Sequence, residues 1–345
     1  MAGKKVGIKE VSQEAGVAIS TVSHVLNGTA SISPQVRARV MDAARRLGYL
    51  ARRRAKANAT ALGTVVLAVP DDAMPENEIN LFSWTVLSAL SRDCERRGVR
   101  LMPITGNGSL TARGIVDFVQ ANSADGVVLI NDDRPDLLRG IRASGIPAVL
   151  INGEDQDMHI DSVTPGNRFG ARLATDWLIK QGHRSILHLT WQGRTTIRRR
   201  LDGFLDAGEA SGLPMEAFQV FHAEGYAPAL GEAAIRTWLD RHDGLGGVTA
   251  IFCAADNLAL GALRALDGAG LSVPGDVSVM GFDGIVLGEL SRPPLTTIKV
   301  PLEQIGPQAL HLLEQRLITA DEPRAAHRLE LGCEIAVRGS VGAPA

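Results

Sequence analysis

The chain has little cysteine and lacks any long apolar run. Its three cysteines, Cys94, Cys253 and Cys333, lie far apart and do not have the spacing of metal ligands. This usage favours a reduced, cytosolic compartment over a disulfide framework. No apolar stretch approaches the roughly 18 residues of a membrane-spanning helix. The start, MAGKKVGIKEV, contains lysines but no apolar segment of the kind that a secretory signal needs. We therefore expect a cytoplasmic protein without a membrane segment.

Motifs of common enzyme classes are missing as well. The sequence contains no GxSxG, no GxxxxGK[ST], no HExxH, and no GxGxxG directly after a strand. We therefore expect no catalytic residue, no metal and no cofactor. The hydrophobic content of 45% and charged content of 21% allow a well-buried core, and 345 residues are enough for two or three domains.

Charge is distributed unevenly along the chain. The formal net charge is −2, but residues 1–60 hold eleven Lys and Arg against three Asp and Glu. The remaining residues carry a net charge of −10. A basic segment followed by an acidic body is typical of a nucleic-acid-binding module attached to a part with another task.

The amino-terminal segment predicts three short helices, at about residues 8–15, 19–26 and 34–47. Gly16 permits a left-handed turn that ends the first helix. Ser33 and Pro34 form a strong start signal for the third helix. The expected core positions are Ile8, Val11, Ala15, Val22, Val25, Leu26, Val36, Val40, Ala43, Ala44 and Leu47. The pattern predicts a helix-turn-helix whose second helix enters the DNA major groove.

From residue 63 onward, short apolar strands alternate with helices. The expected strands lie at 63–70, 99–105, 126–131, 147–152, 185–190, 219–222, 249–254 and 277–283, and a last strand lies within 293–301. Such alternation predicts parallel sheets with helices on both faces. The number of units favours two doubly wound lobes with a cleft between them. Ligands of such sheets bind at the carboxyl ends of strands, which makes Asp71, Asn131, Asp256 and Asp283 candidates.

Several motifs together resemble the lac repressor (LacI/GalR) family of bacterial transcription regulators. They include IKEVSQEAGVAISTVSHVLNG, ADGVVLI, IKQGHRSI, RLDGF, AIFCAADNLALGAL and VPGDVSVMGFDG, and the match covers almost the whole length. The resemblance implies a small all-α helix-turn-helix head plus an α/β body, with two doubly wound parallel-sheet lobes of the periplasmic-binding-protein type. The implied divisions are a head at 1–49, a basic hinge at 50–62 and a body at 63–345. Within the body, the amino lobe is about 63–164 and 293–322, and the carboxyl lobe is about 165–292 and 323–340.

The resemblance also implies which residues contact DNA. Ile19, Ser20 and His24 match base-reading positions of the family's recognition helix. His24 can donate to guanine acceptors, and Ile19 offers an apolar contact to a thymine methyl group. The expected phosphate or backbone contacts are Thr21, Ser23, Asn27, Arg52, Arg53, Arg54 and Lys56.

This sequence departs from the family in two places near the head. Ala18 stands where a Ser or Thr is usual, which removes a helix cap worth about 1 kcal/mol. The hinge is about four residues shorter than usual, and no Leu stands at the position that wedges into the minor groove. Arginines 52–54 and Lys56 can attract phosphate instead. We therefore expect a less kinked operator centre and a steeper salt dependence of binding.

In the body, the resemblance implies a small effector between the lobes. The matching effector-binding positions are Phe82, Arg200, Tyr226, Asp256 and Asp283. An arginine, carboxylates and a stacking ring suit a polyhydroxylated ligand such as a sugar or sugar derivative. Arg198 and Arg199 are interpreted as a solvated face. Asp256 is equally compatible with capping the following helix.

Three alternatives stay open at this point. A regulator of the same fold can respond to a non-sugar metabolite, or to no small ligand, since Ala255 replaces an Asn that is usual in the family. A transport-type binding protein conflicts with the basic head, and an enzyme conflicts with the missing motifs. The expected partners are double-stranded operator DNA, a small effector and a second copy of the chain. Residues 320–345 show no leucine heptad, so we expect a dimer and not a tetramer.

Overall fold

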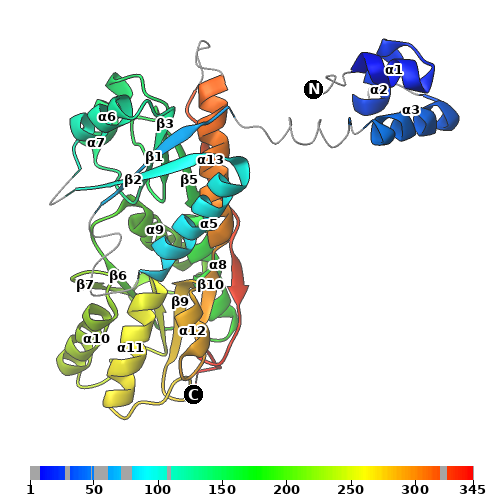
Figure 1. The fold of residues 1–345 in the computed structure, drawn as a ribbon. Helices are drawn as coiled ribbons and strands as arrows, with labels where there is room; N and C mark the ends of the chain where they lie inside the picture. Colours follow the sequence, from blue (N-terminus) through cyan, green and yellow to red (C-terminus); the bar gives the residue numbers. More distant parts are fainter. Residues whose placement is uncertain are drawn as a thin grey trace. The chain divides into compact units, whose positions relative to one another are not determined.

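The computed structural model describes residues 8–27, 32–47, 49, 61–70, 80–106, 110–318 and 325–344. Internal contacts divide the chain into two units, Met1–Ala61 and Leu62–Ala345. The first unit is helical, and the second contains two parallel sheets covered by helices (Figure 1).

The first unit contains α1 (Ile8–Ala15), α2 (Ile19–Asn27) and α3 (Pro34–Arg46), so the three predicted helices are confirmed. Their shared core consists of Val11, Ala15, Val22, Val25, Val40, Ala43 and Ala44. Gly16 has a φ of 62°, the left-handed turn that its position required. The Nη2 atom of Arg39 in α3 donates to the carbonyl oxygen of Ala15 at 2.6 Å. This hydrogen bond satisfies a carbonyl at the end of α1 and ties that helix to α3.

The first sheet of the body is entirely parallel, with the order β11-β5-β4-β3-β1-β2. Its strands are β1 (Thr64–Val69), β2 (Arg100–Thr105), β3 (Gly126–Ile130), β4 (Ala148–Ile151), β5 (Asp161–Pro165) and β11 (Arg328–Leu331). Strands β1, β3 and β4 are Val- and Ile-rich runs buried nearly throughout, as expected for the centre of a parallel sheet. We call this sheet and its helices lobe 1.

The second sheet has the order β12-β10-β9-β8-β6-β7. Its strands are β6 (Ile186–Trp191), β7 (Phe218–Ala223), β8 (Ala250–Cys253), β9 (Ser278–Asp283), β10 (Thr296–Lys299) and β12 (Glu334–Ala336). The edge strand β12 pairs antiparallel with β10, whereas the other pairings are parallel. We call this sheet and its helices lobe 2.

Helices cover both sheets (Figure 1). Those of lobe 1 are α5 (Leu81–Arg97), α6 (Ala112–Ala121), α7 (Pro135–Ala143) and α13 (Leu302–Ile318). Those of lobe 2 are α8 (Asn167–Lys180), α9 (Thr195–Ala210), α10 (Pro228–His242), α11 (Asp256–Gly268) and α12 (Val286–Leu290), with a short 3-10 turn, η2 (Met215–Ala217). No helix in these described stretches is both long and apolar enough to cross a membrane.

The expected lobe boundaries need two corrections. Strand β10, expected in the amino lobe, pairs with β9 and belongs to lobe 2. Strand β11, expected in the carboxyl lobe, pairs with β5 and belongs to lobe 1. The chain therefore passes between lobes after β5, between β10 and α13, and between β11 and β12. Strand pairing decides these points, and the local pattern of the sequence does not encode it.

Some elements were not predicted from the sequence. Strand β5 carries the polar residues Asp161, Ser162 and Thr164, yet it is buried throughout because both of its neighbours are strands. Helix α13 was not predicted either, and it contains Pro307. Its apolar face nevertheless packs against α5 and the lobe 1 sheet.

Candidate functional site

The exposed face of α2 is the candidate DNA-reading surface. Val22 and Val25 point into the core of the head, whereas Ile19, Ser20 and His24 are exposed. Ile19 keeps 47% of its surface accessible. The three residues expected to read bases therefore lie on the solvent side of the helix.

The remaining DNA-contact expectations are placed only in part. Thr21 and Ser23 are half-buried beside the exposed face of α2. Asn27 ends the helix, but its side chain lies outside the described residues. Arg52, Arg53, Arg54 and Lys56 lie outside the described residues too.

The candidate effector site is a pocket between the two lobes, with a cavity volume of ≈ 40 Å³. The residues that line it come from both lobes: Asn80, Phe82, Asn152, Trp191, Arg194, Ile197, Arg200, Tyr226, Ala255, Asn257, Asp283 and Ile285. Four of the five expected effector residues, Phe82, Arg200, Tyr226 and Asp283, are among them.

Arg200 is held rigidly on α9. Its Nε donates to Oδ1 of Asn167 at 2.9 Å, and its Nη1 donates to the carbonyl oxygen of Ala254 at 2.6 Å. The guanidinium lies over the ring of Phe282, 3.8 Å from the centroid. Since Arg200 is only 2% exposed, these contacts leave it a single orientation at the pocket wall. Such preorganisation suits recognition of a polar ligand.

Asp283 is the partner of Arg200 at the carboxyl end of β9. Its Oδ1 lies 2.9 Å from Nη2 of Arg200. Burial raises the pKa of the Asp283 carboxyl, and the positive charges of Arg200 and Arg194 offset part of that rise. The backbone of Asp283 has a φ of 122°, a conformation rare outside glycine. Strain of this kind concentrates at functional sites.

Asp256, expected to bind the effector or to cap α11, is fully buried and is not among the residues that line the pocket. Its Oδ1 accepts from Oγ1 of Thr297 at 2.6 Å, and its Oδ2 accepts from the backbone N–H of Ile285 at 2.8 Å. Burial and the nearby charge of Asp283 raise its pKa to about 7, although these hydrogen bonds act in the opposite direction. Asp256 is a structural link between α11, β10 and the loop after β9. The next residue, Asn257, faces the pocket instead.

Lobe 1 contributes a chain of buried amides. Nδ2 of Asn152 donates to Oδ1 of Asn131 at 2.6 Å, and Nδ2 of Asn131 donates to Oγ of Ser83 at 3.0 Å. Oδ1 of Asn152 is buried and has no hydrogen-bond partner among the described residues. Asn152 also lines the pocket, so an unpaired acceptor belongs to one of the lining residues. Asn131 therefore supports the site from behind, whereas Asp71 lies outside the described residues.

Aromatic rings complete the pocket. The rings of Trp191 and Tyr226 are tilted against each other with centroids 5.9 Å apart, and the Arg194 guanidinium lies 5.4 Å from the Tyr226 centroid. Trp191, Arg194 and Asn152 were overlooked in the sequence. All three follow or end strands β6 and β4, so the rule that ligands bind at strand carboxyl ends could have found them.

The described residues hold no group of three or more His, Cys, Asp or Glu side chains arranged for a metal ion. The chemistry of the pocket is that of binding: fixed charges, amides and aromatic rings, aimed from two lobes at one space. A body of this type, joined to a helix-turn-helix unit, defines the class of DNA-binding regulators with a ligand-binding body.

Comparisons with known proteins agree with this class. Residues 7–51 match the family model for bacterial regulatory proteins of the lacI family, and residues 175–341 match a periplasmic binding protein-like domain. The chain belongs to the lacI family. It is a DNA-binding transcriptional repressor with a body of the periplasmic-binding-protein type, as the resemblance had implied.

Individual relatives cover nearly the whole chain. The HTH-type transcriptional repressor PurR of Actinobacillus pleuropneumoniae serotype 3 (strain JL03) is 31% identical over 341 residues, 97% of this chain and 98% of the relative. PurR of Vibrio vulnificus (strain CMCP6) is 29% identical over 343 residues, 97% of this chain and 98% of the relative. These relatives are transcriptional repressors and not enzymes.

Two solved structures show the same architecture. A complex of the transcriptional regulator CelR with cellobiose has a TM-score of 0.70 at 29% identity and covers 97% of this chain and 100% of its own. The lac repressor dimer bound to operator and the anti-inducer ONPF has a TM-score of 0.69 at 22% identity, covering 99% of this chain and 100% of its own.

Proposed function

We propose that the protein is a homodimeric repressor that binds a palindromic operator in the cytoplasm and is controlled by a sugar or sugar derivative. The ligand occupies the interlobe pocket, and Ile19, Ser20 and His24 read the operator bases. Residues 50–62 act as a basic hinge between the head and the body. Ligand binding shifts lobe closure and thereby operator affinity, with a coupling of about 1–3 kcal/mol.

The ligand class is inferred from the combination of polar groups and aromatic rings in one pocket. Arg200 is a fixed donor, Asp283 and Oδ1 of Asn152 are acceptors, and the amide of Asn257 can do both. Hydroxyl groups donate and accept, so a polyhydroxylated ligand can satisfy all of these groups. The rings of Trp191 and Tyr226 offer faces to the apolar side of a sugar.

Similarity to the CelR–cellobiose complex supports the same ligand class. Ala255 lines the pocket where the family usually has Asn, so one polar contact of the family pattern is missing here. A sugar in which one hydroxyl group is missing or modified fits this difference. A non-sugar metabolite with a flat ring is the second candidate, since the paired rings of Trp191 and Tyr226 also suit stacking.

The dimer is supported by exposed apolar side chains on lobe 2. In α12, Val286 is 54% exposed, Leu287 45% and Leu290 73%. A short helix with this much exposed apolar surface is stabilised when a partner covers it. We propose that α12 of a second copy covers this apolar surface, because a twofold axis brings the same patch of each copy together. A dimer also presents two heads to the two halves of a palindrome.

The function is tested in two stages. Selection of genomic fragments on the purified full-length protein identifies the operator, and a palindrome with two half-sites is the expected result. A thermal-shift panel of sugars, sugar phosphates and non-sugar metabolites then identifies the effector, because a ligand stabilises by RT ln(1 + [L]/Kd). Release or strengthening of operator binding by the stabilising compound establishes the regulation. A panel in which only non-sugar compounds stabilise would exclude the sugar assignment while leaving the repressor function intact.

A further inference from the structure

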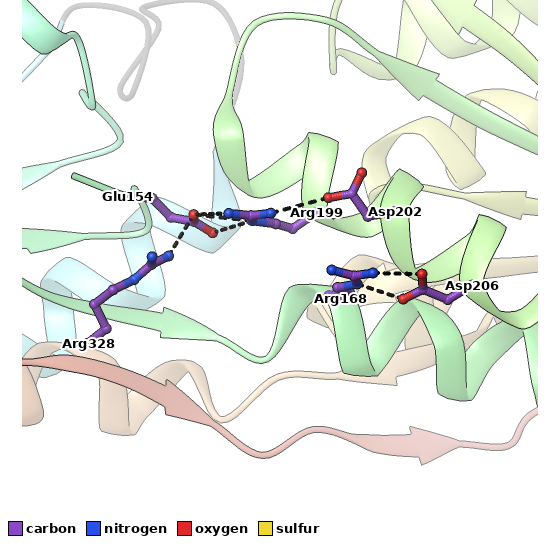
Figure 2. Close-up of polar contacts among 6 residues, drawn as sticks. All are labelled: Glu154, Arg168, Arg199, Asp202, Asp206 and Arg328. Atoms are coloured by element: carbon purple, nitrogen blue, oxygen red, sulfur yellow. Dashed lines mark hydrogen bonds and ion pairs between the residues drawn. The ribbon is translucent and has the colours of Figure 1, made fainter. Parts of the chain in front are cut away.

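An ion pair between Glu154 and Arg199 joins the two lobes (Figure 2). Glu154 follows β4 in lobe 1, and Arg199 lies on α9 in lobe 2. The Nε of Arg199 donates to Oε1 and Oε2 of Glu154 at 3.0 and 3.2 Å, and Nη2 donates to Oε2 at 2.9 Å. Arg199, expected on a solvated face, is thus bound across the interlobe boundary. Arg198 beside it is exposed.

Both members are adjacent in sequence to pocket residues. Arg199 precedes Arg200 on the same helix, and Glu154 lies two residues after Asn152. A rotation of one lobe against the other that changes the pocket therefore also changes the Glu154–Arg199 distance. The Glu154 side chain is 5% exposed and that of Arg199 is 37% exposed, so solvent screens this pair less than a surface pair but more than a fully buried one. The bidentate geometry further strengthens it.

Each partner also has a second ion pair within its own lobe. Nη2 of Arg328 on β11 lies 2.6 Å from Oε2 of Glu154, inside lobe 1. Nη1 of Arg199 lies 3.4 Å from Oδ2 of Asp202, inside lobe 2 (Figure 2). When the lobes separate, neither charge is left alone. Breaking the interlobe contact thus avoids the large penalty of an unpaired buried charge, and the contact can open and close reversibly.

We propose that Glu154 and Arg199 form an interlobe latch that holds the lobes together over the pocket and sets effector affinity. The proposal rests on the pocket being the effector site. Opening of the latch lowers the fraction of the protein that is competent to bind, so apparent affinity falls by that fraction. Arg328 and Asp202 each pair with one latch residue inside its own lobe and make no contact of the latch across the boundary.

The test measures lobe separation directly in the full-length protein. Spin labels are placed at the exposed positions Arg113→Cys in lobe 1 and Asp240→Cys in lobe 2, in a Cys333→Ser background. Arg199→Met removes the interlobe contact, and Arg328→Met is the matched control that removes only the contact inside lobe 1. The expected result is a longer or broader distance distribution for Arg199→Met and an unchanged one for Arg328→Met. Unchanged distances in both variants would overturn the latch.

Glu154→Gln provides a second variant that keeps the side-chain size but removes the charge. It is expected to lengthen the distance as Arg199→Met does, and its thermal unfolding establishes that it is folded. With the effector identified, Arg199→Met lowers apparent affinity by up to about tenfold while Asp202→Asn leaves it near wild type. The distance measurement needs no effector. A latch that fails this test leaves the proposed repressor function standing, and a missing sugar response leaves the latch result standing.

Discussion

The Nη2 atom of Arg200 lies 2.9 Å from Oδ1 of Asp283, joining two of the charged side chains that line the pocket. Both residues are nearly fully buried. Replacing Arg200 with Met leaves Asp283 without its main compensating charge, and removing one partner of a buried pair costs about 3–5 kcal/mol. We expect Arg200→Met to lower the free energy of unfolding by that amount and to abolish stabilisation by the effector. Chemical denaturation with and without the ligand measures both.

Arg168→Met is the matched control for this change. Arg168 pairs with Asp206 between α8 and α9 (Figure 2). The Arg168 side chain is 49% exposed. Solvent screens such a pair, so its loss should barely change stability or ligand response. An equal loss of stability in both variants would contradict the buried-pair argument.

Asp256 predicts a pH dependence of stability. Its folded pKa of about 7 lies above the ordinary value of 3.8. Asp256 therefore stabilises the folded state fully at pH values below the pKa that its carboxyl has in the unfolded chain. This stabilisation declines as the pH rises through the pKa of the folded state. Wild type should lose stability relative to Asp256→Asn between about pH 4 and pH 7. Melting temperatures of the two proteins across this range give the comparison, and parallel curves would show that Asp256 does not titrate there.

Gly203 marks the closest approach of α8 and α9. A Cβ at this position would overlap the backbone carbonyl oxygen of Arg168. Gly203→Ala should therefore push apart the helix that carries Arg200 and its neighbour, with a loss of about 1–3 kcal/mol. Gly268 offers the same substitution at the end of α11, where a Cβ meets nothing within 4 Å. Gly268→Ala should be neutral or stabilising by about 0.4–1 kcal/mol, and urea unfolding of both variants tests the contrast.

The exposed face of α2 predicts that substitutions there lower operator affinity in a base-specific way. Ile19→Ala and His24→Ala should each relax discrimination at one operator position by about 1–3 kcal/mol. Neither side chain belongs to the core of the head, so thermal stability should stay near wild type. Binding assays against single base-pair variants of the operator measure the loss. Uniform weakening on every sequence would reassign these residues to backbone contacts.

The hinge arginines predict the opposite behaviour. Arg52→Ala and Arg53→Ala should weaken binding equally on all sequences and reduce the salt slope by about one for each charge removed. Operator titrations over a range of salt concentrations provide the slope. An unchanged slope would show that these side chains do not contact phosphate.

Much of the fold was predictable because hydrophobic periodicity and helix signals act locally. Ile8–Ala15 emerged as a helix with the expected ends, and the buried strand at 126–130 stands out by its apolar run alone. Four pocket residues were found through the family resemblance. Strand β5 was not predicted, because its polar residues become buried only when neighbouring strands surround them.

The amino-acid sequence by itself determined the helix-turn-helix, the two-lobed α/β class and the family, since local patterns and motif order carry these. Only the tertiary structure decided where β10 and β11 pair, which depends on partners distant in the chain. It also decided how Asp256 and Asn257 are oriented: adjacent helical residues point in different directions, so Asp256 accepts hydrogen bonds from Thr297 and Ile285 while Asn257 faces the pocket. The Glu154–Arg199 contact was likewise decided by the tertiary structure alone, because no local signal links a loop residue to a helix 45 positions away in another lobe.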